Sequence, residues 1–135
     1  MYQQILQILH DSALIAEPEI TELKVYGEER FRVKIRGNVT ESLTLQIWIN
    51  HNPLRTRYSY QLFGEERPIL RWDNAPHHPE LPENFPHHVH DEQGAMFSSE
   101  LTGNPLEDVL SVLLGIEEFL EGLHAQEGYL PKGDL

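Results

Sequence analysis

The stretch Arg30-Phe-Arg-Val-Lys-Ile-Arg36 alternates without interruption between basic and apolar side chains. Because successive side chains of a β-strand point to opposite faces, this period of two predicts a strand with one buried face and one positively charged, solvated face. Gly27-Glu-Glu29 precedes the stretch and Gly37-Asn38 follows it, and both are turn signals. The chain is therefore expected to reverse direction on either side of this strand.

The same alternation continues along the chain as far as residue 73. It predicts five strands joined by short turns, at residues 20–26, 30–36, 43–50, 57–63 and 67–72. Short connections of this kind favour an antiparallel meander that turns one face toward a core.

Apolar residues return to helical spacing at the two ends of the chain. Residues 1–15 predict a short amphipathic helix, which Pro18 prevents from continuing. Asn104-Pro-Leu-Glu107 combines a cap residue, a proline at the first helical position and a glutamate at the third, a capping-box arrangement. The apolar stripe that follows is interrupted by Gly115, which a close contact between helix and sheet would justify.

Together these elements predict a single α+β domain over residues 1–126. It consists of an N-terminal helix, a five-stranded antiparallel β-meander, a loop rich in histidine and proline, and a C-terminal helix packed on the sheet. Residues 127–135, which hold two glycines and a proline, are expected to form a flexible tail.

Composition narrows the functional classes. The chain has no cysteine, which excludes disulfides, thiolate nucleophiles and cysteine-ligated zinc. The first residues lack a basic segment, and no stretch approaches the roughly 20 apolar residues of a membrane span, so a soluble, cytoplasmic protein is expected. The net charge is −12, yet residues 24–71 carry nine basic and five acidic side chains, a net of +4.

The basic face of the strand at residues 30–36 has two interpretations. It is either a solvated surface with acidic cross-strand partners or a platform for single-stranded nucleic acid, in which Trp48 adds aromatic surface. The neighbouring strand offers the polar residues Thr44, Gln46 and Asn50 but no carboxylate. The candidate substrate-binding residues are Arg30, Arg32, Lys34, Arg36, Trp48 and Arg57.

Five of the eight histidines lie within fourteen residues, in the segment Asp73-Asn-Ala-Pro-His-His-Pro-Glu-Leu-Pro-Glu-Asn-Phe-Pro-His-His-Val-His90. Three interpretations are open: imidazoles that hydrogen-bond loop carbonyls, a site for a divalent metal such as zinc, and general acid–base catalysis. For a metal, His88 and His90 are the better pair because they share a side in extended backbone. For catalysis, which requires no cofactor, the candidates are Arg71, Asp73, His77, His78, His87, His88 and His90.

Arg71-Trp-Asp-Asn-Ala-Pro-His-His-Pro-Glu-Leu81, followed by Phe85-Pro-His-His-Val-His90, resembles the signature of the TumE family. The sequence departs from that pattern at Trp72, where tyrosine or histidine is usual, and at Val89, where a basic residue is expected. The resemblance implies a β-meander that closes with a helix, and a toxin of a prokaryotic toxin–antitoxin module whose cognate antitoxin binds DNA. It implies no catalytic residues.

Two hypotheses follow. In the first, the chain is a toxin that cleaves RNA as a ribonuclease-type phosphodiesterase, with the strand cations and Arg71 binding phosphate and the loop histidines transferring protons. In the second, it is a non-catalytic binding module whose open sheet face docks an acidic partner protein, and the loop is a rigid scaffold or metal site. Neither involves a membrane.

Overall fold

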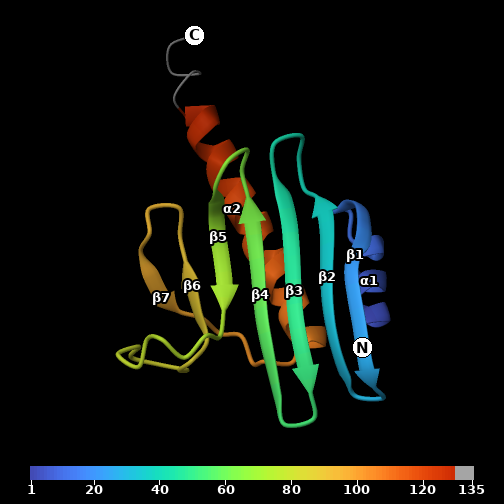
Figure 1. Ribbon diagram of the computed structural model, residues 1–135. Coiled ribbons are helices and arrows are strands. Elements are labelled where there is room, and N and C mark those ends of the chain that lie inside the picture. Colours follow the sequence, from blue (N-terminus) through green and yellow to red (C-terminus); the bar gives the residue numbers. More distant parts are fainter. Residues whose placement is uncertain (130–135) are drawn as a thin grey trace.

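The computed structural model describes residues 1–129 of the chain. In this range, seven strands form one antiparallel sheet in which each strand pairs with the next along the chain (Figure 1). The strands are β1 (Ala16–Gly27), β2 (Arg30–Asn38), β3 (Thr44–Asn52), β4 (Arg55–Phe63), β5 (Pro68–Asp73), β6 (His88–His90) and β7 (Met96–Ser98). Helix α1 (Tyr2–Asp11) and helix α2 (Pro105–Tyr129) cover one face of the sheet and leave the other face open. The α+β class is confirmed.

The sequence predicted five strands, and the structure has two more. Strands β6 and β7 lie at the end of the segment predicted to be a loop and just beyond it. All the prolines of that segment precede β6, so its three residues keep their backbone donors. Three residues are too few to show a period of two, which is why the sequence did not reveal them.

Strand β1 begins at Ala16, four residues earlier than predicted, and so contains Pro18. The strand tolerates this residue because β1 is the edge of the sheet, and because its pairing with β2 is irregular between Ala16 and Glu19. Proline is confined to such edges and bulges since it donates no ladder hydrogen bond. Helix α1 correspondingly ends at Asp11 rather than near residue 15.

The core lies between the sheet and the two helices. The alternation predicted for β2 is confirmed, because Phe31, Val33 and Ile35 are all buried. Helix α1 contributes Ile5 and Leu9, which are almost fully buried. The remaining core is built mainly from apolar side chains of β3, β4 and α2, with Trp72 of β5, and it forms one contiguous cluster.

Helix α2 begins where the sequence predicted. The Asn104 side-chain oxygen accepts a hydrogen bond from the Leu106 backbone N–H at 3.1 Å, as an N-cap residue does. The predicted capping box is not closed, because the Glu107 carboxylate instead accepts a hydrogen bond from the Thr102 hydroxyl at 3.2 Å. Most of the flexible tail predicted at residues 127–135 lies outside the described residues and stays a prediction.

Gly115 marks the closest approach of α2 to the sheet. A Cβ atom at this position would lie 2.9 Å from Cζ2 of Trp72, a residue of β5 that points toward the helices. The close helix-on-sheet contact that the sequence suggested for this glycine is therefore present.

We predict that Gly115→Ala destabilises the fold by about 1–2 kcal/mol, because displacing Trp72 costs more than the roughly 1 kcal/mol that alanine gains in helix propensity. Thermal denaturation followed by circular dichroism measures this as a melting temperature several degrees lower. Gly122→Ala is the matched control, since no atom of the described residues lies within 4 Å of a Cβ at that position. Equal melting temperatures for the two variants would contradict the contact.

Candidate functional site

The helices leave one face of the sheet open, and we call it the outer face. The basic side chains of β2 and the side chains of two of the histidines both project from this face. Two rows of directly paired residues cross it from β2 to β6. The first row is Lys34, Trp48, Ser59, Asp73 and His88, and the second is Arg36, Gln46, Gln61, Arg71 and His90. Residues predicted separately from a strand and from a loop therefore share one surface.

The basic strand does not touch the histidines, however. Strands β3 and β4 separate β2 from β5, a distance of about 14 Å at roughly 4.8 Å per strand spacing. A hollow of about 560 Å³ occupies the intervening surface. Its lining includes the predicted residues Trp48, Arg57, Arg71 and Asp73, together with Arg55, Ser59 and Gln61.

Strand β1 partly neutralises the basic strand. Glu22 stands opposite Lys34 and pairs with it, the Nζ and Oε2 atoms lying 3.4 Å apart with both side chains about two-fifths exposed. Arg30 lies over the ring of Tyr26, 5.4 Å from its centroid. The acidic partner absent from the third strand is thus supplied by the first, although an exposed pair of this kind is weak.

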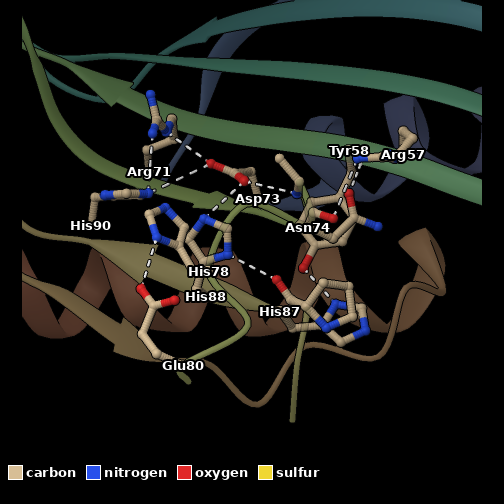
Figure 2. Close-up of polar contacts among 12 residues, drawn as sticks. Arg57, Tyr58, Arg71, Asp73, Asn74, His78, Glu80, His87, His88 and His90 are labelled. Atoms are coloured by element: carbon tan, nitrogen blue, oxygen red, sulfur yellow. Dashed lines mark hydrogen bonds and ion pairs between the residues drawn. The ribbon is translucent and has the colours of Figure 1, made fainter. Parts of the chain in front are cut away.

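The histidine cluster, defined as Arg71, Asp73, His78, His88 and His90, is centred on the Asp73 carboxylate (Figure 2). Its Oδ1 lies 3.0 Å from Nε2 of His88, and its Oδ2 lies 2.9 Å from Nε of Arg71 and 3.8 Å from Nε2 of His90. The Arg71 N–H is not aimed at that oxygen, so this contact is an ion pair rather than a hydrogen bond.

Hydrogen bonding distinguishes the two strand histidines. The guanidinium of Arg71 can only donate, so its contact of 3.0 Å with Nε2 of His90 requires that nitrogen to accept, and His90 is neutral. Burial, followed by the charges of Arg71 and His88, lowers the pKa of His90.

His88 is only 1% exposed, and its Nδ1 donates to the Pro86 carbonyl at 2.8 Å while its Nε2 faces Asp73. Both ring nitrogens of His88 therefore face acceptor oxygens.

His78 joins the cluster from the proline-rich segment. Its ring centroid lies 5.0 Å from that of His88 and 5.8 Å from that of His90, and its Nδ1 lies 3.3 Å from Oε1 of Glu80. His78 and His90 are partly exposed, whereas His88 is buried. These three imidazoles could hold a metal ion, because their ligand atoms all lie within 4.8 Å of one another.

The other two candidate histidines lie outside this cluster. His87 points to the opposite side from His88, stacks on Tyr58 with ring centroids 5.8 Å apart, and contacts the Tyr58 hydroxyl at 2.8 Å through Nδ1. Burial lowers the pKa of His87 and raises that of Tyr58, so the hydroxyl donates and the imidazole accepts. His87 also lines a second hollow of about 430 Å³, together with His51. His77 is exposed.

Sequence reasoning missed Asn74, which anchors the start of the histidine-bearing segment. Its buried side chain accepts a hydrogen bond from the Tyr58 backbone at 3.0 Å and donates to the Thr56 carbonyl at 2.7 Å, extending the strand pairing beyond the end of β5. The signals in the sequence were its position directly after the last residue of the strand and its place within the TumE signature. Arg55, which also lines the hollow, was missed because it lies in the turn before the predicted fourth strand.

Comparison with known proteins supports the pattern noted in the sequence. The family model described as Toxin TumE matches residues 5–123 of the 135. The chain belongs to the TumE family. It is accordingly the toxin component of a toxin–antitoxin system, and membership of this toxin family suggests an antitoxin as its partner. No curated protein and no solved structure matches the chain. Among the described helices, none is long and apolar enough to cross a membrane.

The two departures from the TumE pattern are neighbours in space. Trp72 and Val89 stand directly opposite each other in β5 and β6, and both pack against the core. They lie on the side of the sheet away from the histidine cluster, so the substitutions alter packing beneath the cluster and leave its polar side chains in place.

We predict that Asp73→Asn lowers the free energy of unfolding by about 2 kcal/mol, less than the 3–5 kcal/mol typical of a broken buried ion pair because Arg71 is partly exposed. The substitution replaces a carboxylate oxygen that faces the buried His88 and the partly exposed Arg71. Urea denaturation monitored by tryptophan fluorescence measures the change. Glu80→Gln is the control, because Glu80 is exposed, and it should unfold at the wild-type urea concentration. A wild-type midpoint for Asp73→Asn would show that the carboxylate does not stabilise the cluster.

Proposed function

We propose that this TumE-family toxin is a ribonuclease that binds RNA on the outer face and cleaves it at the histidine cluster. The observation that carries the proposal is that the histidine cluster adjoins the hollow of about 560 Å³ on the outer face. Arg71 and Asp73 belong to both, so a strand lying in the hollow would present a phosphate to the two partly exposed imidazoles.

The hollow has the side chains that single-stranded nucleic acid requires. Arg55 and Arg57 offer charge to phosphates, and Trp48 offers a ring on which a base can stack. The cations of β2, namely Arg30, Arg32, Lys34 and Arg36, continue this surface toward the far edge of the sheet. Because the chain as a whole is acidic, RNA is expected to bind along this face and to be repelled elsewhere.

The proposed chemistry is attack of the RNA 2′-oxygen on the adjacent phosphorus, which breaks the bond to the 5′-oxygen and leaves a 2′,3′-cyclic phosphate. His90, which is neutral, accepts the proton of the 2′-hydroxyl, and His78 protonates the departing 5′-oxygen. When a phosphate binds Arg71, its guanidinium turns from His90 to the phosphate, which frees Nε2 of the base and stabilises the charge of the transition state.

His88 has a different part in this mechanism. At 1% exposure it does not reach RNA, and its hydrogen bond to Pro86 and its ion pair with Asp73 make it a positioning residue for His90 and Arg71. His77 and His87 lie outside the cluster and are assigned no proton transfer. The reaction needs no cofactor, although the same imidazoles are suited to a divalent metal such as zinc.

The antitoxin is proposed to be a DNA-binding protein, and the proposed site of action is the cytoplasm.

A non-catalytic role is the second candidate. The burial of His88 and Asp73 within a network of hydrogen bonds and ion pairs is what a rigid scaffold requires. In that case the outer face docks an acidic protein through the cations of β2, and the chain cleaves no RNA.

We predict that His90→Ala reduces cleavage of single-stranded RNA by at least about 100-fold, the usual contribution of a general base. The assay uses end-labelled RNA and detects 2′,3′-cyclic phosphate ends, with EDTA present throughout. His77→Ala, purified in parallel, should retain wild-type activity because His77 is exposed and outside the cluster. DNA of the same sequence should remain intact, since it lacks the attacking hydroxyl. Equal cleavage by His90→Ala and wild type, or cleavage by neither, would refute the mechanism.

We predict that Arg57→Ala weakens binding of a 2′-deoxy, non-cleavable oligonucleotide. The loss of one phosphate contact should also reduce the slope of log K against log salt by about 1. Fluorescence anisotropy between about 50 and 200 mM salt measures both quantities. Arg67→Ala is the matched control, because Arg67 is exposed in the turn before β5 and is not part of the hollow. Identical slopes for the two variants would place the nucleic acid elsewhere.

A further inference from the structure

Three imidazoles converge in the histidine cluster from two separate parts of the chain. His88 and His90 are alternate residues of β6 on its outer side, and His78 approaches them from the segment after β5 (Figure 2). All three rings meet edge to face, with centroids 4.9–5.8 Å apart. One ligand nitrogen of each ring lies within 4.8 Å of those of the other two, a spacing at which they could hold a metal ion.

Two of the rings are oriented in the manner of metal ligands. Nδ1 of His88 donates to the Pro86 carbonyl at 2.8 Å, and Nδ1 of His78 lies 3.3 Å from a carboxylate oxygen of Glu80. A metal-binding histidine typically donates its second ring N–H to a carbonyl or carboxylate in this way, which sets the tautomer and leaves Nε2 free to bind. In both residues Nε2 is the nitrogen left for the ion.

The contact between His88 and Asp73 gives an independent reason. Nε2 of His88 and Oδ1 of Asp73 lie 3.0 Å apart at a position where His88 is 1% exposed. The Pro86 carbonyl already requires the proton of a neutral His88 to be on Nδ1, so two lone pairs would face each other at Asp73. A cation bound at Nε2 of His88 would also face this carboxylate.

We infer that the histidine cluster is a site for a first-row divalent metal ion of the zinc class, with His78, His88 and His90 as ligands and the Asp73 carboxylate completing the set. Three nitrogens and one carboxylate suit Zn²⁺ and not Mg²⁺, which prefers oxygen ligands. Tetrahedral zinc with bonds of about 2.05 Å needs ligands about 3.3 Å apart. The ligand atoms of the three histidines lie within 4.8 Å of one another, so metal binding requires side-chain movement to reach that spacing.

Arg71 competes with the ion. Its guanidinium lies 3.0 Å from Nε2 of His90 and 2.9 Å from Oδ2 of Asp73, so it contacts two of the atoms that would bind the ion. Metal binding therefore turns Arg71 outward, toward the hollow that it lines. The side chain is 38% exposed and free to make that movement.

This inference goes beyond the proposed ribonuclease activity and does not rest on it. A bound ion would use the nitrogen lone pairs of His78 and His90, so a metal-loaded toxin would not cleave RNA by the proposed acid–base route. Failure of the two proposals is distinguishable. A chain that binds zinc but cleaves no RNA refutes the activity alone, and a chain that cleaves RNA but binds no zinc refutes the metal site alone.

The test uses the untagged full-length chain, stripped of metal with EDTA and dialysed, and titrates it with Zn²⁺ in a calorimeter. We expect one Zn²⁺ per chain, a higher melting temperature with zinc, and no binding of Mg²⁺ at millimolar concentration. His78→Ala and His90→Ala should each weaken binding at least about tenfold, and Arg71→Gln should strengthen it. His78 is the key position, because it lies outside the sheet and its loss leaves the strand pairing intact.

His77→Ala is the matched control, since it removes the adjacent imidazole, which is exposed and outside the cluster. It should bind Zn²⁺ as tightly as the wild type does, and circular dichroism verifies that each variant is folded. Absence of zinc binding by the wild type would overturn the inference. Equal losses in His77→Ala and His78→Ala, or Mg²⁺ binding as strong as that of Zn²⁺, would do so as well.

Discussion

The alignment of β6 against β5 is the constraint on which the rest of the site depends. It places His88 opposite Asp73 and His90 opposite Arg71, so four polar side chains project from the same face of the sheet. Because side chains alternate along a strand, a shift of one residue would turn both histidines toward the helices and Val89 toward solvent. The Asp73–His88 ion pair and the hydrogen bond from His88 to Pro86 oppose that shift.

Strand β5 connects the stability of the fold with the chemistry of the site. Trp72 points inward and packs beneath Gly115 of α2, while its neighbours Arg71 and Asp73 point outward into the cluster. The helices therefore support the inner side of the strand, while on the outer side Arg71 is partly exposed and Asp73 is buried in the cluster. This division also explains why the two departures from the TumE pattern, both on the inner side, leave the cluster intact.

Sequence reasoning succeeded for the elements with a long repeating pattern and failed for those without one. Strand β2 and the start of α2 were predicted from seven alternating residues and from the cap at Asn104. Strands β6 and β7 were missed because three residues cannot establish a period. The acidic partner of Lys34 was overlooked because strand order alone did not show that Glu22 would face it from β1.

The candidate site shows the same division. The sequence by itself determined the chemical inventory: five histidines near one another, a basic strand, an aspartate and an arginine at the end of β5, and the TumE signature that contains them. Only the tertiary structure decided that His78, His88 and His90 gather in one cluster, that His87 turns away to Tyr58, and that His77 remains exposed. The reason is physical. Residue types follow directly from the chain, whereas the direction of each imidazole depends on strand pairing and on hydrogen bonds to residues far from it in sequence.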